Sequence, residues 1–257
     1  MDMRLDGRSC LVLGSTSGLG LAIAKGLSAE GANVVVTGRR ESSVTDAVAA
    51  VPRSVGLVAD LSDPAACQRL GREAQRAFGQ IDVLVLNSGG PPPGTAADLT
   101  PHDMDASLRS MLLPQIALAT LLLPQMRTHG WGRVLAIGSS GVQQPIANLA
   151  RSNAARAALA AYLKTLANEV SGQGVTVNML LPGRIDTRRV ADLDEARARR
   201  DEIEIEAVRR ASAATIPIGR YGRTDEFADV AVFLCSDRAS YVTGAQIRVD
   251  GGAISAL

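Results

Sequence analysis

Short hydrophobic runs alternate along the chain with alanine-rich segments of helical character. Several of these runs are apolar throughout, namely CLVLG, VLVLN and VLAIG. Strands covered by helices on both faces have this composition. The pattern therefore predicts repeated β–α units around a buried parallel sheet. The predicted strands are Ser9 to Leu13, Asn33 to Thr37, Val55 to Ala59, Val83 to Asn87, Arg133 to Ile137, Thr176 to Leu180 and Gln246 to Val249.

No linker, repeat or shift of composition divides the chain. Its 257 residues, 46% of them hydrophobic, can bury one large core. We therefore expect one α/β domain over residues 1–257, with a doubly wound, mostly seven-stranded parallel sheet and helices on both faces. The segment 184–223 is the least regular and is dense in charge. A solvated helix face explains the charges, but the segment follows the sixth strand, so it is also a candidate lid over a ligand site.

Charge, cysteine content and hydropathy narrow the classes of partner. The formal net charge of +1 gives no electrostatic reason to expect nucleic acid or an anionic membrane, so we expect a small-molecule partner. Cys10, Cys67 and Cys235 lack the spacing of a metal site or disulfide framework, so we expect no metal. The apolar stretch Met111 to Met126 is too short to span a bilayer comfortably, and residues 1–8 lack a signal-peptide core. We expect a cytoplasmic protein.

A glycine-rich loop, GSTSGLG at Gly14 to Gly20, joins the first predicted strand to an amphipathic helix. Glycines permit a tight turn and close approach of the backbone, and free N–H groups at a helix start attract a pyrophosphate. The loop therefore indicates a Rossmann-type dinucleotide site. The second strand ends in Thr37-Gly38-Arg39-Arg40. An acidic residue there would bind the ribose hydroxyls of NAD, whereas the guanidinium of Arg39 suits the 2′-phosphate of NADP, so we expect NADP(H) in preference to NAD.

Over essentially its whole length the chain resembles the short-chain dehydrogenase/reductase family. The loop has the family's Gly-xxx-Gly-x-Gly spacing, and VADLSD at Val58 to Asp63 is similar to its adenine-contacting segment. Asn87-Ser88-Gly89-Gly90 stands where the family has Asn-Asn-Ala-Gly, and LLPGRIDT at Leu180 to Thr187 matches its Pro-Gly-x-Ile-x-Thr segment. The C-terminal run GRYGRTDEFADVAVFLCSDRASYVTGAQIRVDGG also fits, and the subgroup it resembles most is that of the ketoacyl carrier-protein reductases.

The resemblance implies a set of cofactor contacts. These are expected at Gly14, Ser15, Ser17, Gly18, Leu19, Gly20, Arg39, Asp60, Leu61, Asn87, Gly89, Arg156, Pro182, Gly183, Ile185 and Thr187. It also implies a homo-oligomer, a tetramer or dimer, because the apolar helices expected at Leu108 to Met126 and Leu149 to Leu166 offer more apolar surface than one sheet face covers.

The family's catalytic residues are a serine, a tyrosine, a lysine four residues later and a relay asparagine. Ser139 aligns with the serine. The register anchored on KTLANEV places Ser152 at the tyrosine position, Arg156 at the lysine position and Met111 at the asparagine position. Alternatively, Ser152 and Arg156 are only a pair on a helix surface. Asn153 and Ser140 are candidate substitute polar groups.

Two hypotheses about function follow from these replacements. A serine is a far weaker acid than a tyrosine, and losing general acid–base help costs roughly 10² to 10⁴ in rate. The first hypothesis is an NADP(H)-dependent oxidoreductase of a carbonyl or alcohol, with degenerate catalytic residues and low activity on ordinary ketones. The alternative is a non-catalytic NADP(H)-binding sensor or scaffold on the same fold.

Overall fold

The computed structural model of the protein describes residues 1–255, and the last two positions of the expected domain, 256 and 257, lie outside the described residues. Its centre is a seven-stranded sheet in the order β3-β2-β1-β4-β5-β6-β7, and every neighbouring pair is parallel. The prediction of a mostly parallel seven-stranded sheet is therefore confirmed. The strands are β1 Ser9–Val12, β2 Asn33–Gly38, β3 Ser54–Val58, β4 Val83–Leu86, β5 Gly132–Ile137, β6 Val175–Pro182 and β7 Gln246–Val249.

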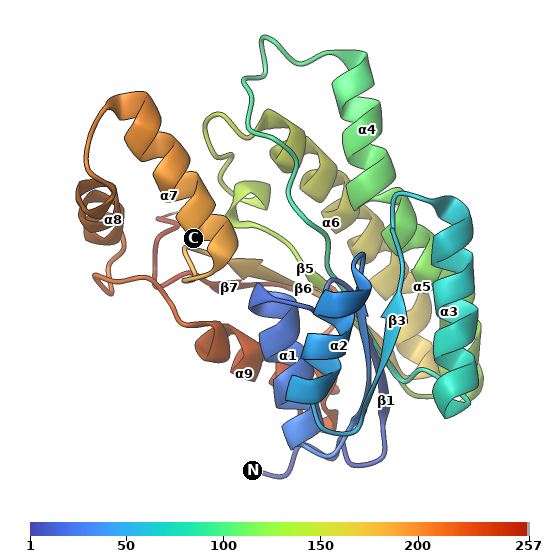
Figure 1. The fold of residues 1–257 in the computed structure, drawn as a ribbon. Coiled ribbons are helices and arrows are strands. Elements are labelled where there is room, and N and C mark those ends of the chain that lie inside the picture. Colours follow the sequence, from blue (N-terminus) through green and yellow to red (C-terminus); the bar gives the residue numbers. More distant parts are fainter. Residues whose placement is uncertain (256–257) are drawn as a thin grey trace.

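Nine α-helices and three short 3₁₀ turns connect the strands within residues 1–255. Figure 1 shows α7 and α8, in orange, set apart from the helices that flank the sheet. The helices are α1 Gly18–Ala29, α2 Glu41–Ala50, α3 Pro64–Phe78, α4 Pro101–Met111, α5 Leu113–Thr128, α6 Ala150–Val170, α7 Arg188–Asp201, α8 Ile205–Ala214 and α9 Thr224–Cys235. The turns are η1 Ser140–Val142, η2 Ser171–Gln173 and η3 Asp237–Ala239.

The sheet buries a separate core on each of its faces. Along β1, Leu11 belongs to the core beneath α3, α5 and α6, whereas Cys10 and Val12 belong to the core beneath α1, α2 and α9. Successive side chains of a strand point to opposite faces, so a strand covered on both sides must be apolar at every position. This is the reason that the strand runs are continuously hydrophobic.

The helical stretch 101–128 is long and apolar enough by composition to cross a membrane. In the fold it is divided at Leu112 into α4 and α5. The inner face of α5, including Leu118 and Leu122, is fully buried in the core that α5 shares with α3 and β5. Packing against the sheet therefore accounts for the apolar inner face of α5.

Five strands end at other residues than predicted: β1 at Val12, β2 at Gly38, β3 at Val58, β4 at Leu86 and β6 at Pro182. Two of these differences, those of β4 and β6, are explained by contacts at the strand end. β4 stops at Leu86, because the side chain of Asn87 turns to the glycine loop and donates to the carbonyl oxygen of Gly14 at 3.3 Å. β6 continues to Pro182, because that residue still pairs with Val249 of β7. Both differences lie at the carboxyl edge of the sheet, where the loops that form ligand sites in doubly wound folds begin.

Candidate active site

The glycine loop has the geometry of a phosphate cradle at the start of α1. Gly14 and Gly18 adopt left-handed backbone conformations, with φ of 57° and 54°. A Cβ at Gly20 would overlap the carbonyl oxygen of Gly14, so only glycine allows the helix to start this close to the loop. Ser17 precedes α1 and makes no side-chain cap, and the N–H groups of the first turn, including that of Leu19, have no side-chain acceptor.

Ser15 differs from the other predicted cofactor contacts in the loop. Its side chain is completely buried, donates to the carbonyl of Val12 at 2.7 Å and accepts from the backbone N–H of Thr37 at 2.8 Å. Its own N–H donates to the carbonyl of Thr37 at 3.0 Å. The side chain of Ser15 therefore ties the loop to β1 and β2. The sequence motif alone could not distinguish this structural role from a direct contact with the cofactor.

The end of β2 presents Arg39 to solvent. Arg39 is exposed and forms no ion pair within the part of the chain that the structure describes. It lies near Asp60, after β3, whose carboxyl accepts from the N–H and hydroxyl of Ser62 at 2.9 and 2.8 Å. The Ser62 hydrogen bonds, with a smaller contribution from Arg39, hold the pKa of Asp60 below its ordinary value. Leu61 packs against the core, so its side chain anchors this loop.

The predicted catalytic residues come together at the carboxyl end of β5. Ser139 follows the strand, and its hydroxyl oxygen accepts from the N–H of Gly141 at 3.1 Å. Arg156 reaches back from the second turn of α6 and donates through Nη1 to the carbonyl of Ile137 at 2.6 Å. Ser152, one turn earlier on α6, is half-buried, and its hydroxyl makes no hydrogen bond to any of residues 1–255. Arg156 therefore contacts the chain at Ile137, two residues before Ser139.

Burial dominates the electrostatics of Arg156. Only 8% of the residue is exposed, so the alternative that Arg156 belongs to a helix surface pair is wrong. Burial first, and repulsion from Arg189 second, lower the pKa of Arg156 to about 10. The side chain therefore remains a cation at neutral pH. A buried cation of this kind can stabilise negative charge on a ligand, but it does not exchange its proton readily.

The candidate substitute Asn153 has a structural role. Its amide donates to the carbonyl of Ile146 at 2.9 Å and accepts from the N–H of the same residue at 3.3 Å. These two bonds fasten the loop between η1 and α6 to the helix. The amide oxygen and one N–H of Asn153 are therefore already engaged, whereas Ser140 begins η1 beside Ser139 and stays half-buried.

Met111 fills the relay position with a buried thioether, and a residue that sequence analysis missed lies beside it. Gln115, one turn into α5, is fully buried, donates to the carbonyl of Met111 at 2.5 Å and lies 3.3 Å from the hydroxyl of Ser88. Its Oε1 has no hydrogen-bond partner in residues 1–255. A glutamine inside an otherwise apolar helix was the available signal, but its contact with the loop after β4 appears only in three dimensions.

The Pro-Gly segment after β6 closes over the glycine loop. Gly183 lies against Asp250, and a Cβ there would come within 2.6 Å of its Cα. Ile185 is buried and bridges to Gly222.

Thr187 caps α7 by accepting from the N–H of Val190, and a Cβ at Gly18 would lie 3.7 Å from the methyl carbon of Thr187. Pro182 and Gly183 therefore direct Thr187 onto the phosphate cradle. On the other side of the cradle, Gly89 is exposed in the loop after β4.

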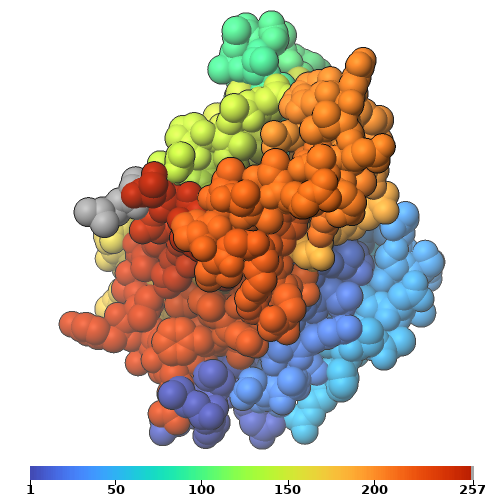
Figure 2. All heavy atoms as spheres, turned by 90° about the vertical axis from the view of Figure 1, so that its left-hand side faces the viewer, coloured from blue at the N-terminus to red at the C-terminus, as the bar shows by residue number. Residues whose placement is uncertain are grey.

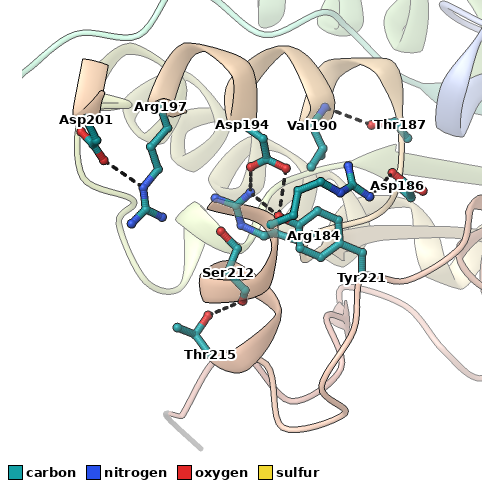
Figure 3. A network of polar contacts seen from close by, with 11 residues as sticks. Arg184, Asp186, Thr187, Val190, Asp194, Arg197, Asp201, Ser212, Thr215 and Tyr221 are labelled. Atoms are coloured by element: carbon teal, nitrogen blue, oxygen red, sulfur yellow. Dashed lines mark hydrogen bonds and ion pairs between the residues drawn. The ribbon is translucent and has the colours of Figure 1, made fainter. Parts of the chain in front are cut away.

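The segment 184–223 contains more than a solvated face, because its charges also form a buried network (Figure 3). Asp194 of α7 is completely buried and accepts from Nη1 of Arg184 at 2.6 Å and from the hydroxyl of Tyr221 at 2.9 Å.

Arg209 of α8 pairs with Asp186 at 3.2 Å and lies over the ring of Tyr221. These contacts fasten α7 and α8 to the loops on either side, and Figure 2 shows the two helices, in orange, covering the centre of this face of the molecule.

Comparisons with known proteins agree with this geometry. The profile of the enoyl-(acyl carrier protein) reductase family matches residues 14–253. The chain is 34% identical to D-beta-hydroxybutyrate dehydrogenase of Cupriavidus necator over 253 residues, covering 96% of this chain and 98% of that protein. It is 32% identical to the 3-oxoacyl-(acyl-carrier-protein) reductase of Escherichia coli, covering 97% and 98%. The structure of L-sorbose reductase from Gluconobacter frateurii, complexed with NADPH and L-sorbose, superposes with a TM-score of 0.94 at 30% identity over 100% of both chains.

Proposed function

Because the chain belongs to the short-chain dehydrogenase/reductase family, we propose that it is an NADP(H)-dependent oxidoreductase of a carbonyl or alcohol, with low activity toward ordinary ketones. The observation that carries the proposal is the position of Arg156, a buried cation bonded to the end of β5 two residues before Ser139. Such a cation suits a site in which negative charge develops on a substrate oxygen. The similar L-sorbose reductase, which was solved with NADPH, supports the choice of cofactor.

The residues of the cofactor site fit a dinucleotide with a 2′-phosphate. The uncapped start of α1 offers N–H groups to a pyrophosphate, and Arg39 has no competing carboxylate partner in residues 1–255. Thr187 and the Pro-Gly segment would border the nicotinamide, and Arg156 would face its ribose. When bound, NADPH supplies a hydride, and the protein's own residues then have to hold the substrate and stabilise the oxyanion.

The proton chemistry proposed for this site differs from that of a site with a catalytic tyrosine. The hydroxyls of Ser139 and Ser152 would hold the substrate oxygen by hydrogen bonds, and Arg156 would stabilise its charge. A serine hydroxyl does not titrate near neutrality, so it gives little general acid help. Hydride transfer therefore depends on how electrophilic the substrate is, which makes ordinary ketones slow.

A second candidate function is a non-catalytic NADP(H) sensor or scaffold. The observation that favours it is the combination of Ser152 and Met111, which leaves the site without a titrating acid and with an apolar side chain at the relay position. The two functions share the cofactor site and differ in hydride transfer. Single-turnover oxidation of bound NADPH by a carbonyl compound therefore separates them.

Fluorescence titration with NADPH and NADH tests the cofactor. We expect NADPH to bind at least about tenfold more tightly, a difference of about 1.4 kcal/mol, because Arg39 forms charge-assisted bonds with the 2′-phosphate. Arg39→Ala should remove most of this preference. Arg40→Ala is the matched control, since Arg40 is the adjacent exposed arginine. Equal affinities in the native protein, or an unchanged ratio in Arg39→Ala, would remove Arg39 from this role.

The arrangement of the whole chain supports two further parts of the proposal. Residues 1–257 form one dinucleotide-binding domain, with 184–223 as a lid that the Asp194 network fastens to the rest of the fold. The protein is a homotetramer or homodimer that associates through α5 and α6, whose exposed positions include Leu113, Ala117 and Pro124 of α5 and four alanines of α6. The lid and the association surface thus lie on different parts of the fold.

A further inference from the structure

Two arginines beside the candidate active site lack carboxylate partners. Within residues 1–255, Arg156 makes a single side-chain hydrogen bond, to Ile137, and Arg189 makes a single one, from Nη2 to the carbonyl of Pro91 at 3.1 Å. Neither belongs to an ion pair in this part of the chain. Most arginines of the neighbouring segment do pair with an aspartate or glutamate, namely Arg184, Arg188, Arg197, Arg199, Arg200, Arg209, Arg220 and Arg223.

The two guanidinium groups approach the same edge of the sheet from different elements. Arg156 extends from α6 to the end of β5, beside Ser139. Arg189 extends from the first turn of α7 to the loop after β4, where a Cβ at Gly90 would lie 2.9 Å from its Nη2. Strands β4 and β5 are parallel neighbours, so the loop after β4, which Arg189 contacts, begins beside the end of β5, which Arg156 contacts. Repulsion from Arg189 contributes, after burial, to the lowered pKa of Arg156.

Two like charges near one another, one of them buried, are unfavourable without an anion. Burial of an uncompensated charge is costly, and a second cation nearby adds to that cost. A bound anion would relieve both effects. The planar fork of a guanidinium matches a carboxylate, and most N–H groups of both arginines remain unbonded to the described residues.

The anionic groups of a dinucleotide have other partners in this site. The start of α1 is suited to the pyrophosphate, and Arg39 to a 2′-phosphate. The nicotinamide end of the cofactor, which Arg156 would face, carries no carboxylate. The anion between Arg156 and Arg189 therefore has to come from the second ligand of the site.

We propose that Arg156 and Arg189 bind the carboxylate of the substrate, so that the protein acts on an oxo acid or hydroxy acid rather than on an uncharged ketone. This inference rests on the proposed function, because it takes the adjoining site to hold NADP(H). The buried Arg156 uses one N–H toward Ile137, so its remaining N–H groups can hold the inner side of the carboxylate as well as the reacting oxygen. The exposed Arg189 closes on it from the lid segment.

Calorimetry on the full chain saturated with NADP⁺ tests the proposal without turnover, because an oxidised cofactor cannot reduce an oxo acid. The probes are acetoacetate and phenylpyruvate, each compared with its methyl ester. We expect at least one acid to bind at least about tenfold more tightly than its ester, in line with a charge-assisted hydrogen bond. If neither acid binds more tightly than its ester, the proposal is wrong.

The variant Arg189→Met tests whether the carboxylate of the substrate binds at Arg189. Arg189 is exposed, so the variant should fold, and it should weaken binding of the acid at least about tenfold while leaving NADP⁺ affinity unchanged. Arg188→Met is the matched control, since the Arg188 side chain is 80% exposed and pairs with Asp192, and it should leave both affinities unchanged.

Loss of NADP⁺ affinity with unchanged acid binding in Arg189→Met would assign Arg189 to a cofactor phosphate and overturn the proposal. Failure of the native protein to bind NADP⁺ at all would instead contradict the proposed function.

Discussion

On the proposed register, Arg156 stands where the family has a lysine, so a planar guanidinium takes the place of a flexible ammonium group. The guanidinium is charged at neutral pH and could lower the pKa of a neighbouring phenol. There is no phenol at Ser152, one turn earlier on the same helix. We therefore propose that the pair keeps the positive charge of the family's site without its titrating acid.

The pH dependence of the reaction should reflect this charge. Because the pKa of Arg156 is lowered to about 10, the cation is present below that pH and is lost as the pH rises through it. We expect kcat/KM for an oxo acid at saturating NADPH to be flat between about pH 6 and pH 9 and to fall above about pH 10. A steep change in kcat/KM between pH 6 and pH 9 would indicate a titrating acid that the site does not contain.

Removal of the Ser152 hydroxyl should have a small effect. The hydroxyl contributes at most a neutral hydrogen bond to the substrate oxygen, so Ser152→Ala should reduce kcat by less than about tenfold. Ser139→Ala, the matched variant in the loop after β5, should reduce kcat more, because that hydroxyl is fixed by its bond with Gly141 and follows the strand end that Arg156 contacts. A larger loss in Ser152→Ala than in Ser139→Ala would make Ser152 the principal donor.

The sequence predicted Ser139, Ser152 and Arg156 as site residues, and this assignment stays a prediction, but it did not predict their surroundings. The burial of Arg156 could not be read from the spacing, because it depends on packing between α6 and the end of β5. The nearness of Arg189 also escaped prediction. Its bond to Pro91 joins positions 98 residues apart, and such tertiary bonds leave no periodic signal.

Among the elements, one buried carboxylate, that of Asp194, fastens the proposed lid segment 184–223 to the adjoining loops. Asp194 accepts from Arg184 and Tyr221, so Asp194→Ala would leave a cation and a hydroxyl without their acceptor. We expect the free energy of unfolding to fall by about 2 to 4 kcal/mol, measured by urea denaturation. Asp192→Ala is the control, because Asp192 is 47% exposed and pairs with Arg188 on the helix surface, and it should cost less than about 0.5 kcal/mol. Equal losses in the two variants would show that the network does not fasten the lid.

The strands were predictable because burial on both faces makes each of them continuously apolar. The position of the charged segment 184–223 after the sixth strand was also predictable. Its internal network was not, because Asp194 and Tyr221 are 27 residues apart within a segment dense in charge. In such a segment a buried carboxylate has the same local sequence pattern as a solvated one.

For the molecule as a whole, we propose that the outer face of α6 between Ala154 and Ala161 associates with a second copy. Ala154, Ala157, Ala158 and Ala161 are exposed on it, and small side chains allow helices from two copies to approach closely. Light scattering at micromolar concentration should give two or four times the chain mass of 26.8 kDa. Ala161→Glu should lower this mass, whereas Ala49→Glu on the exposed face of α2 should not. A native monomer would contradict the proposed assembly.

Single-turnover hydride transfer shows whether a dinucleotide site with altered proton chemistry, as we propose, reduces an uncharged ketone slowly. The protein loaded with NADPH is mixed with methyl acetoacetate, an uncharged ketone, and the loss of NADPH absorbance is followed. We expect a native rate far below about 10 per second, and a rate at least about tenfold higher in Ser152→Tyr with Arg156→Lys, which restores a phenol beside a cation. A native rate of about 10 per second or more, with no gain in the double variant, would contradict the account.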